Sequence, residues 1–314
     1  MENSKFYIIS EDIYNLMMGA GTPENYYTSR GYKIPDEGLF QELRKDMEYN
    51  LRDMFTNVKT FSEKEMDESM NAFAKTSKYP VVSLDRVYIN KTPKIMAFLD
   101  VTRINDNGCI KLMTRTGSNY VDVNTEVSII SNKIKTITGK EKPEISIVDD
   151  VIFSGEAISD ICKMFADNDI TVREAFGGIC TDLAQKTLSG SGIDVNYGYQ
   201  IDNFIDQICE RDFYLGVPQS GIFINKEGSL FKRPYFSPFG DPVTRASIPE
   251  EKSTEFSIKC LDRASLLYKA MEDKSKKAVM VGDLPEAIYN LGNKNAKVVD
   301  VIKNAKDILN ERRY

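Results

Sequence analysis

The fold is decided by the stretch Ile145-Ser146-Ile147-Val148-Asp149-Asp150-Val151-Ile152-Phe153-Ser154-Gly155-Glu156-Ala157-Ile158. Its first part is almost wholly apolar and ends in two adjacent acids, which predicts a buried strand that carries Asp149 and Asp150 to its carboxyl end. A turn of small residues follows, and a helix is expected over 157–168. Ligands bind at the carboxyl edge of the sheet in open α/β folds, so the stretch also marks a candidate site.

The sequence on either side repeats this alternation of strand and helix. Strands are expected at 110–114, 144–149 and 172–180, and helices at 121–136, 157–168 and 182–188. Alternating elements of this kind predict an α/β fold with a mostly parallel sheet flanked by helices. We expect three parts: an N-terminal helical extension (1–78), the α/β core (79–195), and an aromatic-rich hood followed by C-terminal helices (196–314).

Composition excludes several classes of chemistry. The chain has 314 residues and no histidine, so Ser-His-Asp triads, Cys-His pairs and His-ligated zinc sites are ruled out. The 41 basic and 47 acidic residues give a net charge of -6, which disfavours a broad nucleic-acid interface. The five cysteines show no CxxC spacing, and no apolar run approaches the ~18 residues of a membrane span. A cytoplasmic protein with reduced thiols and no membrane contact is expected.

The turn after the acids suits a phosphate group. A turn that opens into a helix presents free backbone N–H groups and the positive end of the helix dipole. Neighbouring residues of a strand point to opposite faces, so Asp149 and Asp150 are not expected to share a proton there. Where the chain leaves strand geometry, both acids can face the hydroxyls of one ligand, directly or through Mg²⁺.

Residues Val148 to Ala157 resemble the phosphoribosyl-pyrophosphate (PRPP) signature of type I phosphoribosyltransferases. The Gly-x-Ala-Ile ending is most similar to the orotate phosphoribosyltransferase form. The resemblance implies the fold of that family, with Asp149 and Asp150 as catalytic residues that hold the ribose 2′- and 3′-hydroxyls and contact Mg²⁺ through substrate or water. The implied contacts to the 5′-phosphate are Ser154, Gly155, Glu156 and Ala157. Phe153 stands where the family has Thr, Ser or Ala.

The same resemblance implies a pyrophosphate loop after an earlier, neighbouring strand. Its expected residues are Arg115, Thr116, Gly117 and Ser118, which follow the strand 110–114. A plain strand-to-helix turn is the alternative for this segment. Asp100 and Arg103 are a weaker candidate and are expected to form an ion pair at a strand end.

The family's acceptor-binding hood corresponds to the aromatic segment of this chain. Charged residues lie between aromatic ones at Arg211, Asp212, Phe213 and Tyr214, which suits an acceptor held by charge and stacking. The alternative is a buried salt bridge that stabilises a long loop.

The leading hypothesis is Mg²⁺-dependent binding of PRPP and transfer of its phosphoribosyl group to an unknown base or amine, with release of pyrophosphate. The alternative is a non-catalytic nucleotide- or sugar-phosphate-binding module, in a regulatory or interaction role, on the same fold. A third interpretation has the acids merely cap the next helix. The resemblance also implies a homodimer. Val279 to Asp283 is similar to a late motif of haloacid-dehalogenase phosphatases, but Leu99 to Thr102 supplies only one of the two acids that their nucleophile motif needs.

Overall fold

The structure, a computed structural model, describes residues 5–20, 26–89, 94–106, 108–114 and 122–311. The chain divides into two compact units. Unit 1 comprises Met1–Ser62, Asn105–Gly108 and Asn203–Tyr314, and unit 2 comprises Glu63–Ile104 and Cys109–Asp202. No helix within the described ranges is long and apolar enough to cross a membrane.

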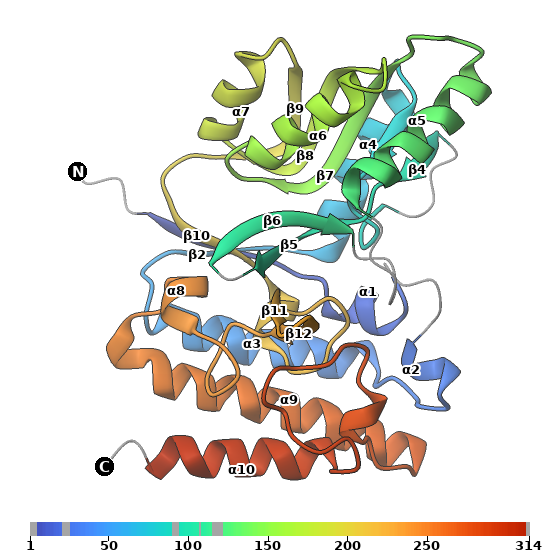
Figure 1. Cartoon of the computed structure of the whole chain (residues 1–314). Coiled ribbons are helices and arrows are strands. Elements are labelled where there is room, and N and C mark those ends of the chain that lie inside the picture. The colour runs from blue at the N-terminus through green and yellow to red at the C-terminus, as the bar shows by residue number, and fades with distance from the viewer. Residues whose placement is uncertain (1–4, 21–25, 90–93, 107, 115–121, 312–314) are drawn as a thin grey trace. The chain divides into compact units, whose positions relative to one another are not determined.

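Unit 2 is built on a five-stranded parallel sheet (Figure 1). Its order is β4 (Ile95–Phe98), β3 (Val81–Ser83), β7 (Glu144–Ile152), β8 (Thr171–Thr181) and β9 (Asp194–Ile201). The helices of the unit are α4 (Glu63–Thr76), α5 (Val123–Thr138), α6 (Glu156–Ala166) and α7 (Asp182–Ser189). The predicted α/β class, with a parallel sheet flanked by helices, is confirmed.

Strand β7 is the middle strand of this sheet, between β3 and β8. Ile145 and Ile147 are fully buried and belong to a core cluster with apolar residues of α5, α6 and α7. On the other face, Phe176 of β8 stacks on Phe73 of α4, with ring centroids 4.5 Å apart. Because helices cover both faces of the sheet, the residues of β7 from Ile145 to Val148 are apolar except for Ser146.

The strand before α5 departs from the prediction. β6 (Cys109–Thr114) lies beside β5 (Val101–Asp106) in a separate sheet and is not a strand of the five-stranded one. Its first three residues are exposed, Ile110 to 48%. A strand inside a covered parallel sheet would be buried on both faces, and β6 is not. The strand beside β7 is instead β3, which has only three residues.

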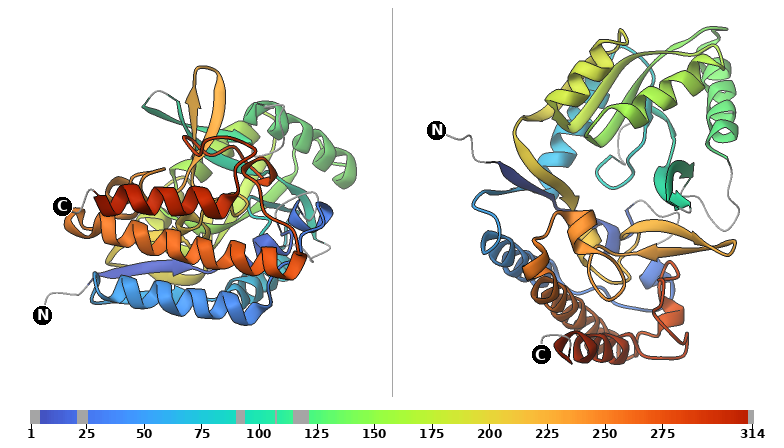
Figure 2. Two further views of the ribbon diagram at one scale, coloured as in Figure 1. Left: turned by 90° about the horizontal axis from the view of Figure 1, so that it is seen from below. Right: turned by 60° about the vertical axis from the view of Figure 1, so that its left-hand side comes forward.

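Unit 1 contains a three-stranded parallel sheet in the order β10 (Phe204–Cys209), β1 (Phe6–Ser10) and β2 (Val58–Phe61). Helix α9 (Ser253–Ser275) lies between α3 (Glu37–Arg52) and α10 (Val298–Glu311), as Figure 2 shows. The antiparallel pair β11 (Ile222–Lys226) and β12 (Ser229–Arg233) belongs to the aromatic segment. The remaining helices are short: α1 (Ile13–Met17), α2 (Tyr26–Ser29), α8 (Pro242–Ala246) and the 3-10 turns η1 (Glu210–Phe213), η2 (Glu250–Lys252) and η3 (Val281–Asp283).

This division differs from the expected three parts. The opening strand β1 pairs with β10, so the N-terminal residues and the aromatic segment share one sheet and form one unit. Helix α4, which the sequence placed in the N-terminal extension, belongs to unit 2 and covers a face of its sheet.

Candidate functional site

The carboxyl ends of β3 and β7 bring three acids together in unit 2. The two strands run parallel, with Ser83 opposite Val148, and the amide of Leu84 donates to the carbonyl of Val148 at 2.8 Å. Asp85 therefore follows β3 at the edge where β7 carries Asp149 and Asp150. Asp85 was missed at the sequence level, although its place directly after a short apolar run was an available signal.

The carboxylates of this edge repel one another. Burial, and then the charges of Asp150 and Asp85, hold the pKa of Asp149 well above its ordinary value. Burial and the charge of Asp150 raise the pKa of Asp85 to about 7, although backbone N–H donors work in the opposite direction. Asp149 and Asp150 remain in strand geometry, and Asp149 Oδ1 accepts from the amide of Asp150 at 3.0 Å. The charges of the two acids therefore interact, although neighbouring residues of a strand point to opposite faces.

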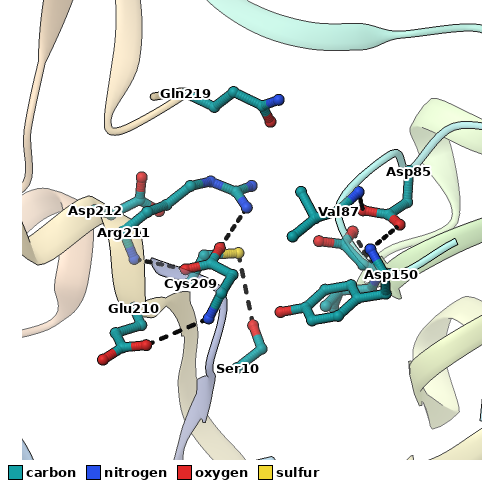
Figure 3. Close-up of polar contacts among 12 residues, drawn as sticks. Ser10, Asp85, Val87, Asp150, Cys209, Glu210, Arg211, Asp212 and Gln219 are labelled. Atoms are coloured by element: carbon teal, nitrogen blue, oxygen red, sulfur yellow. Dashed lines mark hydrogen bonds and ion pairs between the residues drawn. The ribbon is translucent and has the colours of Figure 1, made fainter. Parts of the chain in front are cut away.

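The carboxylate of Asp85 is held by the loop that follows it. Its oxygens accept from the amides of Val87 at 3.0 Å, Tyr88 at 2.8 Å and Ile89 at 3.1 Å. The residue is only 4% exposed, and the hydroxyl of Ser83 donates to its carbonyl at 2.7 Å. Figure 3 shows Asp85 with Val87 and the neighbouring Asp150. The loop is therefore organised around one buried carboxylate.

The turn after β7 has the geometry that a phosphate site needs. Gly155 is the N-cap of α6 in the left-handed conformation, with φ +79°, and no side chain caps this helix. Ser154 Oγ accepts from the amide of Glu156 at 3.3 Å. A helix supplies no acceptor for the amides of its first turn, so the amides of Ala157 and Ile158 suit an anion.

Strand β8 and helix α7 support this turn. The hydroxyl of Thr181 donates to the carbonyl of Phe153 and also accepts from the amide of Ala184 at 3.1 Å. A Cβ atom at Gly155 would lie 3.2 Å from Leu188 Cγ, so α7 packs directly against the turn. The predicted residues Ser154–Ala157 therefore form one supported turn that leads from β7 into α6.

The expected pyrophosphate residues Arg115, Thr116, Gly117 and Ser118 lie outside the described residues, and their role stays a prediction. Asp100 does form an ion pair, but with Arg86, whose Nε lies 3.3 Å from its Oδ2, and not with Arg103 as expected. Arg103 is an exposed residue of β5, whereas Asp100 is 4% exposed. The partner was missed because Arg86 follows a different strand.

The oxygen donors of the edge suit Mg²⁺ held together with a ligand. Across the described ranges, no group of three or more His, Cys, Asp or Glu side chains is arranged to hold a metal ion. Both oxygens of Asp85 already accept from amides, which leaves Asp149 and Asp150 as the carboxylate donors. Mg²⁺ usually takes one or two carboxylates and completes its shell with water and phosphate oxygens. The residues present fit that kind of site.

The predicted acceptor residues lie in unit 1, at the end of β10 (Figure 3). Arg211 forms an ion pair with Asp12, whose Oδ1 also accepts from the Arg211 amide at 2.9 Å. Asp212 Oδ1 accepts from the amide of Gly221 at 2.7 Å. Phe213 and Tyr214 are fully buried. Their role toward an acceptor stays a prediction, while the buried ion pair of the alternative interpretation is present.

The phosphatase-like motif at residues 279–283 has a structural role in unit 1. Asp283 lies in η3, where its Oδ2 accepts from the hydroxyl of Tyr32 at 2.6 Å and from the amide of Met280 at 3.1 Å. The bond from Met280 closes a local turn, and the bond from Tyr32 joins that turn to the N-terminal part of unit 1, so the acid has a structural role.

Comparisons with known proteins give partial similarities. No family model matches the chain, and no curated protein matches it. Orotate phosphoribosyltransferase from Aeropyrum pernix is 13% identical over 44% of this chain and 68% of that chain, with a TM-score of 0.22. The Mycobacterium tuberculosis H37Rv orotate phosphoribosyltransferase in complex with PRPP is 13% identical over 43% of this chain and 70% of that one, with a TM-score of 0.26. UMP synthase of Leishmania donovani is 11% identical over 44% of this chain and 26% of that chain, with a TM-score of 0.23. Matches at this level assign no function to the chain.

Proposed function

We propose that unit 2 binds a 5-phosphoribosyl compound at the carboxyl end of β7. The observation that carries the proposal is the sequence of features along one continuous segment: two acids within the last four residues of β7, a left-handed Gly155, and the uncapped start of α6. The acids suit the paired hydroxyls of a ribose, and the helix start suits its phosphate. The same residues carry the resemblance to the PRPP signature.

Each part of the segment has a separate role in this proposal. Asp149 and Asp150 accept hydrogen bonds from the ribose 2′- and 3′-hydroxyls, and the turn Ser154–Ala157 surrounds the 5′-phosphate. Mg²⁺ at Asp149 and Asp150, held through water or the ligand, would neutralise phosphate charge at an edge that is otherwise strongly negative.

In the fuller form of the proposal the ligand is PRPP and the protein is a phosphoribosyltransferase. The bond between the ribose anomeric carbon and pyrophosphate breaks, and a bond from that carbon to a base or amine forms. Positive charge develops on the ribose as the leaving group departs, as in glycoside chemistry. Positioning and electrostatic stabilisation drive such a reaction, so the absence of histidine is no obstacle.

The pyrophosphate contacts would then come from the loop after β3. The resemblance implies a loop that follows an earlier, neighbouring strand, and β3 is the neighbour of β7 that precedes it in the chain. The segment Leu84–Ile89 lies at that position. Arg115–Ser118, which follow β6, remain the second candidate for the same contact.

Binding without transfer is the second candidate function. Its support is the carboxylate of Asp85, which occupies the amides of the loop where a pyrophosphate contact is expected. An acid at this position repels an anionic leaving group. A nucleotide- or sugar-phosphate-binding module with a regulatory or interaction role would keep the Asp149–Asp150 edge and the Gly155 turn without needing that contact.

Calorimetric titration of the full chain with PRPP in MgCl₂ tests the proposal. Saturable binding is expected, with a loss of affinity of at least roughly tenfold in Asp149→Asn and Asp150→Asn, because each replaces a carboxyl oxygen that accepts from a ribose hydroxyl by an amide nitrogen that cannot. Asp169→Asn, an exposed acid at the opposite edge of the sheet, is the matched control and should bind as the wild type does. Absence of binding of both PRPP and ribose 5-phosphate, or equal binding by all variants, would rule the proposal out. Pyrophosphate release with a panel of bases and amines then separates transferase from binding module.

A further inference from the structure

The two sides of the β7 strand end are built differently. On the β8 side, the Phe153–Gly155 turn is fixed by Thr181 and packs against α7. On the β3 side lies the loop after β3, which holds the carboxylate of Asp85. A ligand that lies across the end of β7 therefore meets backbone N–H groups at one end and a negative charge at the other.

This asymmetry gives a bound ribose 5-phosphate a direction. The inference rests on the proposed binding of a 5-phosphoribosyl compound, with its phosphate in the turn at the start of α6. The 5-phosphate and the substituent on C1 lie at opposite ends of a ribose. With the phosphate on the α7 side and the hydroxyls at Asp149 and Asp150, the C1 substituent is directed to the β3 side, toward Asp85.

The backbone N–H groups of the loop after β3 already bind an anion of the chain, the carboxylate of Asp85. Three successive amides converge on one carboxylate, which is the arrangement of a backbone anion site. The donors that could hold an external phosphate are therefore used. Asp85 is also 4% exposed and interacts electrostatically with Asp149 and Asp150, so the side chain adds negative charge where little solvent screens it.

We propose that Asp85 is a specificity-determining residue that disfavours a charged pyrophosphate on C1, so that the site takes ribose 5-phosphate or a nucleoside monophosphate in preference to PRPP. The discrimination has two causes at the C1 end: the negative charge of Asp85 repels a pyrophosphate, and the loop amides already donate to Asp85. The 5-phosphate end is untouched, because Gly155 and the start of α6 lie on the other side of β7. Asp85 thus selects between ligands by their substituent on C1, and it does not contribute to the affinity for the ribose 5-phosphate moiety that they share.

Ribose 5-phosphate and PRPP are the matched pair of probes, because they differ only in the pyrophosphate on C1. Both are titrated calorimetrically into the full chain at pH 8.5, at which Asp85 is ionised, and at one MgCl₂ concentration, and the readout is the ratio of their dissociation constants. Wild type is expected to bind ribose 5-phosphate at least as tightly as PRPP. In Asp85→Asn the ratio should move toward PRPP by roughly tenfold or more, since one unit charge is removed at short range. Asp169→Asn, which removes the same charge at the opposite edge, should leave the ratio unchanged.

The ratio separates specificity from a merely structural role of Asp85. If Asp85 only stabilises its loop, Asp85→Asn weakens both ligands equally and the ratio stays at the wild-type value, which overturns the inference. Asp85→Ser, which keeps a hydroxyl oxygen as an acceptor for the amides, must shift the ratio in the same direction as Asp85→Asn. If both variants lose ribose 5-phosphate binding, Asp85 belongs to the common part of the site and the inference is wrong.

The proposed function fails in a different way. A wild type that binds PRPP much more tightly than ribose 5-phosphate overturns the role of Asp85 and leaves phosphoribosyl binding intact. A wild type that binds neither compound overturns phosphoribosyl binding, and the inference with it.

Discussion

The hydroxyl of Thr181, at the end of β8, donates to the carbonyl of Phe153 in the turn after β7, 28 residues earlier in the chain. The same oxygen accepts from the amide of Ala184 and so caps α7. One buried side chain therefore joins the candidate phosphate turn to the next strand and the next helix. The turn is not a free loop, and its shape depends on β8.

Replacing Thr181 with Val should loosen this turn. The β-branched shape is kept, but both the cap of α7 and the bond to Phe153 are lost, which should lower the free energy of unfolding by about 1–2 kcal/mol. Urea denaturation measures this change, and titration with ribose 5-phosphate measures the effect on the site. Thr181→Ser keeps the hydroxyl and should restore most of both losses. Equal losses for Val and Ser would show that the hydroxyl is not what matters.

Gly155→Ala should disturb the same turn through its backbone. At φ +79° a residue with a Cβ is strained by about 1–2 kcal/mol, and here the new atom would also lie 3.2 Å from both Leu188 Cγ and Thr187 Cβ. Gly192→Ala is the matched control, because Gly192 has φ +77° and a Cβ added there would meet no atom within 4 Å. Urea denaturation should show a larger loss for Gly155→Ala, and only this variant should lose affinity for ribose 5-phosphate. Equal losses would mean that contact with α7 is unimportant.

The sequence was sufficient for the site segment because its signals are local. An apolar run, two acids and a Gly turn before a helix lie within 14 residues, and the structure has β7, the left-handed Gly155 and α6 in that order. The parallel pairing of β7 with β8 also follows from the helix between them. Right-handed strand–helix–strand connections leave little freedom for such neighbours.

The pairing of β7 with its other neighbour, β3, could not be predicted from local signals in the sequence. Strand β3 has three residues, and 60 residues separate Ser83 from Glu144, so neither length nor spacing marks the pairing. The more regular run 110–114 looked like the preceding strand, yet β6 pairs elsewhere. Asp85 was overlooked for the same reason, since its importance depends on which strand lies beside β7.

In the aromatic segment, residue types alone do not distinguish a ligand contact from a ring buried in the core. The sequence predicts an acceptor contact for Phe213 because charged residues directly precede it, whereas its ring is fully buried and meets Phe256 edge-on, with centroids 4.9 Å apart. Phe213→Ala should therefore lower the free energy of unfolding by about 3–5 kcal/mol, as expected for a buried aromatic ring. Phe213→Leu should cost clearly less. Urea denaturation decides between this role and a ligand contact, which would leave stability nearly unchanged.

Glu210 should make the stability of the protein depend on pH. Its side chain is fully buried at the end of β10, where Arg44 Nε lies 2.9 Å from its Oε2 and the amide of Asp12 donates to the same oxygen at 3.3 Å. Burial, against the opposing charge of Arg44 and together with the charge of Asp12, raises its pKa to about 8. The folded state therefore keeps a proton at pH values where the unfolded chain, with the ordinary pKa of 4.5, has lost it.

The sign of the effect follows from this difference in bound protons. The contribution of Glu210 to the free energy of unfolding is present in full below about pH 4.5, falls as the pH rises toward 8, and is constant above that, with a total change on the order of 5 kcal/mol. Urea denaturation between pH 5.5 and 8.5 should show the decline. Glu210→Gln, which cannot titrate, should make it shallower, whatever it does to stability at a single pH. An equally steep decline in Glu210→Gln would place the titration in other groups.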